Sequence, residues 1–117
     1  MKSILLIEDD FEMGNLLKFL FEIEGIHCTF PNDFIQETIN NHIIEHNPDI
    51  ILMDVNLKQN NGLLILQALK RSKILNKETK VILTSGSDLK EKCLDAGADY
   101  FLLKPYMPDE LLKMIKN

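Results

Sequence analysis

Short apolar runs alternate along this chain with segments whose apolar residues follow helical spacing, and this alternation restricts the possible folds more than any other feature. Short apolar runs of this kind are typical of strands, and three of them are unbroken blocks rather than apolar–polar alternations. Unbroken blocks indicate strands that are covered on both faces, as in a parallel sheet. The five runs cover residues 4–7, 27–30, 50–53, 81–83 and 100–103.

The segments between the runs carry apolar residues three and four positions apart, which predicts amphipathic helices. The first helix is expected to end at Gly25, the second before Pro48, and the fifth to begin at Pro108. Asp88 and Glu91 resemble a capping box at the start of the fourth. In the first helix the residues with this spacing are Met13, Leu16, Leu17, Leu20 and Ile23. In the third helix the expected core contacts are Leu64, Leu66, Ala68 and Leu69.

The order of elements is therefore a strand followed by a helix, repeated five times. Such a pattern predicts right-handed crossovers and an α/β fold in which an open parallel sheet carries helices on both faces. The chain has 117 residues with no linker, repeat or low-complexity segment. It is expected to form one domain over residues 1–117.

Composition excludes several classes of function. The net charge of −5 argues against direct binding of nucleic acid, which needs clustered lysine and arginine. No apolar run approaches the roughly 18 to 20 residues of a membrane span, so we expect no membrane partner. Two isolated cysteines, Cys28 and Cys93, suit neither a disulfide framework nor a zinc site. These features predict reduced thiols and a cytoplasmic protein.

Polar side chains follow several of the predicted strands, at the edge where parallel sheets bind ligands. The acids Glu8 and Asp9 follow the first run, and Asp54 follows the third. Lys104 follows the fifth run. The fourth run ends in a small polar set, Thr84, Ser85, Gly86 and Ser87.

Three carboxylates in a small volume repel one another unless a cation neutralises them. Oxygen ligands from carboxylates, a backbone carbonyl and water are the preference of Mg²⁺, which shares its coordination shell with phosphate. A lysine opposite such a site pairs with a phosphoryl oxygen, and an aspartate itself can be the nucleophile that forms an aspartyl-phosphate. The set Glu8, Asp9, Asp54 and Lys104 therefore suggests phosphoryl transfer onto Asp54.

Three motifs in order resemble the receiver domain of bacterial two-component response regulators, including the single-domain chemotaxis type. They are the first strand with its acid pair, the strand of Asp54 with Gly62 eight positions later, and the closing segment 97–105. The resemblance covers essentially the whole chain. It implies a flavodoxin-like, doubly wound (βα)5 sheet with strand order 2-1-3-4-5.

The resemblance also implies roles for individual residues. The carboxylates of Glu8, Asp9 and Asp54 would bind Mg²⁺ (or Mn²⁺) together with the backbone carbonyl of Asn56. Asp54 would take its phosphoryl group from the phosphohistidine of a histidine kinase or phosphotransferase. Such a domain acts on itself rather than on a free substrate, so it is a signalling domain and not an enzyme. It would control a downstream protein or a fused output domain.

The resemblance further implies a switch behind the acceptor. Lys104 would pair with the phosphate, and its bond to Pro105 is expected to be cis. The hydroxyl of Ser85 would turn to the phosphate and the ring of Phe101 would turn inward. Alignment of the fourth strand favours Ser85 as this hydroxyl, whereas counting from Asp54 favours Thr84.

Two departures from the family pattern stand out. Lys58 occupies the position where the loop after the acceptor usually has proline. The stretch between the switch hydroxyl and Lys104 is about three residues short, which suggests that the fourth helix or its preceding loop has lost a turn. Because the family often signals through this helix and its neighbours, the sequence does not predict which surface of the domain carries the output.

Two rival hypotheses belong to different classes. A pseudo-receiver would bind partners without being phosphorylated, but the complete set of acids, hydroxyl and lysine counts against it. A haloacid-dehalogenase-type phosphatase also uses an aspartate after a parallel strand, but it requires a second acid where this chain has Asn56. The sequence is compatible both with a stand-alone regulator and with a receiver from a larger protein.

Overall fold

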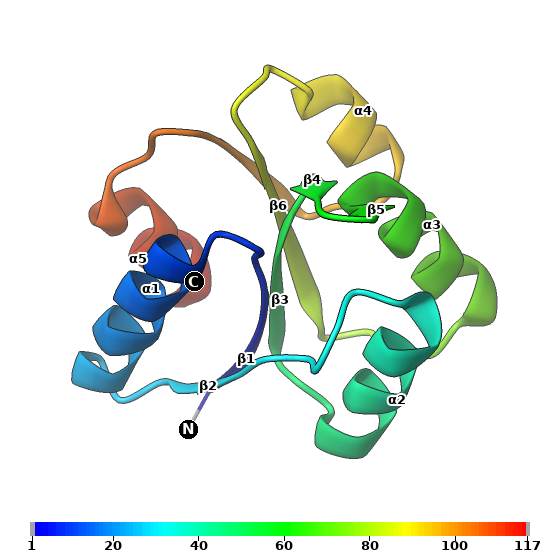
Figure 1. Ribbon diagram of the computed structural model, residues 1–117, viewed down its shortest axis with the longest axis horizontal. Coiled ribbons are helices and arrows are strands. Elements are labelled where there is room, and N and C mark those ends of the chain that lie inside the picture. The colour runs from blue at the N-terminus through cyan, green and yellow to red at the C-terminus, as the bar shows by residue number, and fades with distance from the viewer. Residues whose placement is uncertain (1, 117) are drawn as a thin grey trace.

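The computed structural model describes residues 2–116, in which five parallel strands form one sheet (Figure 1). The sheet order is β2-β1-β3-β6-β7, and every neighbouring pair is parallel. Counted along the chain as five strands, this is the predicted order 2-1-3-4-5, and the predicted fold is confirmed. The strands are β1 Ser3–Ile7, β2 His27–Thr29, β3 Ile50–Asp54, β6 Lys80–Ser85 and β7 Tyr100–Leu103.

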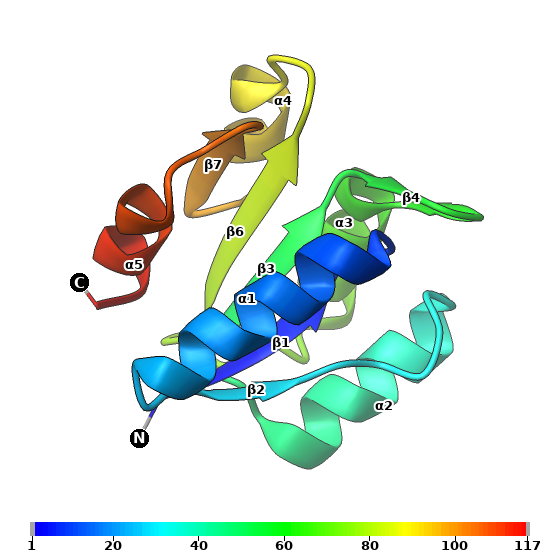
Figure 2. The same cartoon turned by 60° about the vertical axis from the view of Figure 1, so that its left-hand side comes forward.

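Five helices cover the two faces of the sheet. Helices α1 and α5 lie on one face, and α2, α3 and α4 lie on the other (Figures 1 and 2). None of the helices within residues 2–116 combines the length and apolar character needed to cross a bilayer. The helices are α1 Phe11–Ile23, α2 Gln36–His46, α3 Gly62–Ser72, α4 Lys90–Asp95 and α5 Pro108–Lys116.

The alternation of side chains along the central strands divides the core into two halves. In β1 and β3, Leu5 and Ile51 belong to the half beneath α2, α3 and α4, whereas Ile4 and Ile50 belong to the half beneath α1 and α5. All four side chains are at most 2% exposed. Burial on both faces explains why these strands read as unbroken apolar blocks in the sequence.

Helix α1 begins after Asp10 and ends before Gly25, as predicted. Fewer of its apolar residues are buried than the helical spacing predicted. Asp10 caps its start by accepting a hydrogen bond from the Met13 amide at 3.2 Å. The residues directed at the sheet are Gly14, Leu17 and Phe21, spaced by three and four. Leu16 and Ile23, which belong to the predicted apolar spacing, are on the opposite side of the helix and are 66% and 65% exposed.

Helices α3 and α4 also differ from the prediction in detail. Leu64 is 60% exposed, because α3 turns the next residues, Ile65 and Leu66, toward the sheet. The predicted capping box of α4 does not form: the Asp88 carboxylate accepts from the Lys90 amide at 3.3 Å, and the helix has no side-chain cap. Helix α4 has six residues and buries only Cys93.

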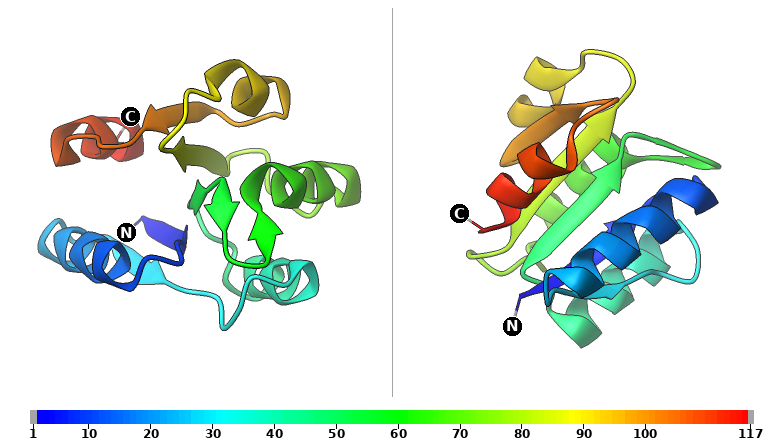
Figure 3. Two further views of the ribbon diagram at one scale, coloured as in Figure 1. Left: turned by 45° about the horizontal axis from the view of Figure 1, so that its top comes forward. Right: turned by 90° about the vertical axis from the view of Figure 1, so that its left-hand side faces the viewer.

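A small antiparallel hairpin, absent from the prediction, extends from the carboxyl end of β3 (Figure 3). It consists of β4 Asn56–Leu57 and β5 Asn60–Asn61. Lys58 and Gln59 form its turn, in which Gln59 has a φ of 64°. The Asn60 side-chain amide donates to the Phe34 carbonyl at 2.5 Å, so the hairpin is tied to the segment that leads into α2.

The first residue of α3, Gly62, lies against the backbone of the Asp54 segment. A Cβ atom at Gly62 would come within 2.4 Å of the Asp54 carbonyl oxygen and 3.0 Å of the Val55 Cα. Both contacts are with backbone, which moves less readily than a flexible side chain. At Gly86, in contrast, a Cβ would have no atom within 4 Å.

We therefore expect Gly62→Ala to destabilise the protein by roughly 1 to 3 kcal/mol, the usual cost of overpacking. The matched control Gly86→Ala adds the same methyl group in open space and should change the free energy of unfolding by less than about 0.5 kcal/mol. Urea unfolding followed by circular dichroism measures both. Equal stability of the two variants would contradict the close approach at Gly62.

Candidate metal-binding site

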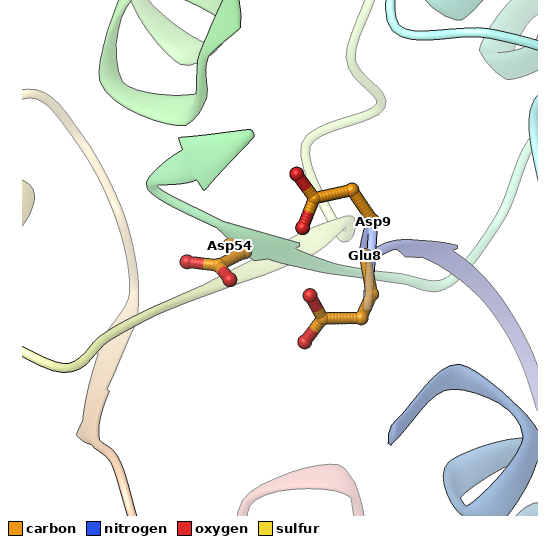
Figure 4. Close-up of side chains that lie close together, drawn as sticks. All are labelled: Glu8, Asp9 and Asp54. Atoms are coloured by element: carbon orange, nitrogen blue, oxygen red, sulfur yellow. The ribbon is translucent and has the colours of Figure 1, made fainter. Parts of the chain in front are cut away.

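Three carboxylates converge at the carboxyl edge of the sheet. Glu8 and Asp9 directly follow β1, and Asp54 is the last residue of β3. The pairing of Ile7 with Met53 brings these two strand ends level. One oxygen from each carboxylate lies within 4.8 Å of the others, and Figure 4 shows the three side chains grouped around one space.

Lys104 joins two of the three acids. It follows β7, and its ammonium group lies 3.0 Å from Glu8 Oε1 and 2.8 Å from Asp54 Oδ2. Asp54 is only 7% exposed. An unpaired carboxylate at this depth would be costly, and the contact with Lys104 offsets part of that cost.

The surroundings shift the pKa of Glu8 and the pKa of Lys104. Burial raises the pKa of Glu8 above its usual value, and the repulsion from Asp54 adds to this, while the hydrogen bond and charge of Lys104 act in the opposite direction. Burial alone would lower the pKa of Lys104, but its contacts with Asp54 and Glu8 outweigh this and raise it. Lys104 therefore stays charged.

Backbone amides hold each carboxylate in place. Asp54 Oδ1 accepts from the Asn56 amide at 3.0 Å. Asp9 Oδ2 accepts from the Lys58 amide at 2.6 Å, and Glu8 Oε2 accepts from the amide of Asp10 at 3.3 Å. Hydrogen bonds of this kind, from a neutral donor to a charged acceptor, are stronger than those between neutral groups, so they fix the directions in which the oxygens point.

Ser85 and Thr84 both reach this edge, on opposite faces of β6. Thr84 pairs with Asp54 across the sheet, and by alternation its side chain shares the face of Ile82. Ser85 is fully buried, and its Oγ accepts from the Ser87 amide at 3.1 Å and lies 3.5 Å from the Asn56 side-chain nitrogen. Ser85 shares its face with Phe101, which packs on the half of the core beneath α2, α3 and α4.

The closing segment contributes two further features. The Lys104–Pro105 peptide bond is cis. Tyr106, which the sequence analysis did not single out, lies near enough to Lys104 to feel its charge; burial raises its pKa to about 12, while Lys104 acts to lower it. The Lys58 amide was also missed, although the absence of proline at that position was visible in the sequence.

The donor set fits a divalent cation. Three carboxylates and one ammonium leave two uncompensated negative charges, which one Mg²⁺ ion cancels. All available ligand atoms are oxygens, and no cysteine or histidine belongs to the cluster found in the described residues. Hard oxygen ligands favour Mg²⁺ or Mn²⁺ over softer metals such as zinc or copper.

Comparison with known proteins identifies the family. The chain matches the model of the response regulator receiver domain over residues 4–116, and it belongs to this family. It is a signalling domain of two-component systems. Receiver domains normally bind Mg²⁺ at an acidic pocket, and Glu8, Asp9 and Asp54 form such a cluster here.

Curated relatives support the same assignment. The transcriptional regulatory protein CpxR of Escherichia coli K12 is 34% identical over 119 residues, which cover 99% of this chain and 48% of CpxR. The cell cycle transcriptional regulator CtrA of Caulobacter vibrioides is 32% identical, with 96% of this chain and 48% of CtrA covered. The chain thus spans about half the length of the curated relatives it matches.

Solved structures agree in fold. The receiver domain of the Francisella response regulator 1452 superposes with a TM-score of 0.86 at 28% identity, covering 99% of this chain and 94% of that one. The Vibrio cholerae chemotaxis protein CheY4 gives a TM-score of 0.84 at 20% identity, covering 99% of this chain and 97% of that one. The second likeness shows the fold alone.

Lys104 and Asp54 act on the pKa of Glu8 in opposite directions, so removing each should shift this pKa in the opposite sense. Lys104→Met removes the ammonium group and should raise the pKa of Glu8, whereas Asp54→Asn removes a like charge and should lower it. Carboxyl ¹³C NMR titration in the presence of a chelator measures the pKa. The control is Lys116→Met, because Lys116 pairs with Glu24 instead and its loss should leave Glu8 unchanged. Shifts of the same sign in the two test variants would contradict the arrangement.

Proposed function

We propose that Asp54 is the phosphoryl acceptor of this receiver domain. The observation that carries the proposal is the position of its carboxylate, which is buried, contacts Lys104 at 2.8 Å and faces Glu8 and Asp9. The donor is the phosphohistidine of a histidine kinase or phosphotransferase. An Asp54 oxygen attacks the phosphorus atom, a P–O bond forms, the P–N bond breaks, and the imidazole nitrogen leaves with its electron pair.

The residues around Asp54 have separate tasks in this transfer. Glu8, Asp9, Asp54 and the Asn56 carbonyl oxygen would hold the Mg²⁺ ion, which, when bound, offsets negative charge on the phosphoryl group. Lys104 supplies a positive charge on the other side and exchanges its contact with the Asp54 carboxylate for a phosphoryl oxygen. The Asn56 amide, 3.0 Å from Asp54 Oδ1, orients the nucleophile.

The switch uses the face of β6 that carries Ser85. A phosphoryl group brings further acceptor oxygens and about one more negative charge to Asp54, and the Ser85 hydroxyl turns toward it as a donor. This movement would break the contacts of Ser85 with Ser87 and Asn56. Phe101, half-buried on the same face, then moves inward.

We infer the wider role of the domain from its membership of the receiver family. The domain acts in the cytoplasm and controls a downstream protein or a fused output domain. The relatives CpxR and CtrA are named as transcriptional regulators and are about twice as long as the chain. The domain acts on itself by accepting and losing its own phosphoryl group, rather than by turning over a free substrate.

Phosphorylation of Asp54 is tested by intact-mass spectrometry after incubation with acetyl phosphate and Mg²⁺. The unchanged chain should gain one phosphate, and Asp54→Asn should gain none, because an amide is not a nucleophile of comparable strength. Asp10→Asn is the matched control: it alters an acid beside the site that caps α1, and it should still be labelled. An equal adduct on the Asp54→Asn chain would reject Asp54, and no adduct on any chain would favour the pseudo-receiver.

The roles of the Ser85 and Thr84 hydroxyls are distinguished by removing each one in turn. Ser85→Ala should still accept phosphate but should lose most of the phosphorylation-induced NMR shift changes at Phe101, because the link between phosphate and ring is gone. Thr84→Ala should retain those changes, since Thr84 lies on the other face of β6. The reverse result would assign the switch to Thr84.

A further inference from the structure

The turn of the β4–β5 hairpin places a backbone donor against one of the metal-binding acids. The Lys58 amide donates to Asp9 Oδ2 at 2.6 Å. We infer that this N–H group positions Asp9 for the cation, and so couples the hairpin to the acidic pocket. The inference rests on the proposed function of Asp9 as a Mg²⁺ ligand, but it concerns a group outside the ligand set.

Asp9 needs such a partner more than the other two acids do. Lys104 already contacts both Glu8 and Asp54. Within residues 2–116, Lys58 supplies the one hydrogen bond to the Asp9 carboxylate. Without it, this half-buried side chain would be free to rotate into solvent, away from the two acids that repel it. The amide therefore orients Asp9, although unlike Lys104 it carries no charge.

The turn that carries the donor is held on both sides by contacts of the hairpin. The hairpin pairs Asn56 with Asn61 and Leu57 with Asn60, which fixes the ends of the turn. Its outer strand is anchored by the hydrogen bond from Asn60 to the Phe34 carbonyl at 2.5 Å. A donor fixed in this way loses little entropy when it orients the acid, which is the physical basis of preorganisation.

The arrangement leaves the acid able to bind metal. A carboxylate has two oxygens with about four acceptor positions, so one hydrogen bond to Oδ2 leaves Oδ1 and a further lone pair available. Donors that orient ligating carboxylates in proteins change metal affinity by about tenfold or more when they are removed. The same scale is expected here, at its lower end, because the Lys58 bond is exposed to solvent.

The chemistry of residue 58 makes the inference testable. Proline has no amide N–H, so Lys58→Pro deletes the donor, while Lys58→Ala deletes the same charged side chain and keeps the donor. Residue 58 is the second of the four residues of a turn whose third, Gln59, has positive φ, and proline is favoured at this place in such turns. The substitution is thus compatible with the hairpin.

The experiment compares Mg²⁺ dissociation constants of the two variants by isothermal titration calorimetry. Lys58→Pro should bind Mg²⁺ roughly tenfold more weakly than Lys58→Ala. Equal constants for the two folded variants would overturn the inference. Failure of the unchanged chain to bind Mg²⁺ at all would overturn the proposed metal site itself, and with it any role of the amide in metal binding.

A second measurement does not depend on the proline variant or on metal. In the unchanged chain, hydrogen exchange followed by NMR should show a protected Lys58 amide. Asp9→Ala should speed its exchange, whereas Asp10→Ala, which removes the neighbouring acid, should not. An unprotected Lys58 amide in the unchanged chain, or one indifferent to Asp9→Ala, would overturn the inference whatever the metal affinity.

Discussion

The mutual repulsion of three carboxylates at one edge of the sheet is the constraint on which the arrangement of this site depends. Glu8 and Asp54 are held together by the Lys104 ammonium, which bridges them at 3.0 and 2.8 Å. Three elements that are distant in sequence, β1, β3 and β7, must therefore end at the same level for the charges to be compensated. The parallel sheet supplies that alignment, and a divalent cation would complete it.

Most of the fold was accessible from the sequence, because burial on both faces leaves an unmistakable run of apolar residues at each central strand. The sequence did not predict which side chains of a helix are buried where adjacent residues are both apolar. Leu16 and Leu17 are both apolar, and spacing alone does not decide which one faces the sheet; Leu17 is buried and Leu16 is not. The β4–β5 hairpin carries no strand-like apolar pattern, since three of its four paired residues are asparagines.

At the site, too, the sequence predicted functional side chains but did not predict the backbone group that contacts them. Sequence reasoning, with the family resemblance, predicted the acids and Lys104, because carboxylates and lysines after parallel strands leave a readable pattern. The Lys58 amide left none, since every residue except proline has an amide and only the three-dimensional turn directs this one at Asp9. Ser85 and Thr84 are adjacent in the chain, and only the alternation of β6 shows that Ser85 shares the face of Phe101.

The short helix α4 should open more readily than the rest of the domain. It has six residues, no side-chain cap at its start and a single buried side chain, Cys93. Its opening exposes far less apolar surface than global unfolding does, so its free energy of local opening is well below that of the sheet. The native ensemble should therefore contain a minor population in which α4 is detached while the strands and the acidic edge persist. Such a state would transiently present the thiol of Cys93 to solvent.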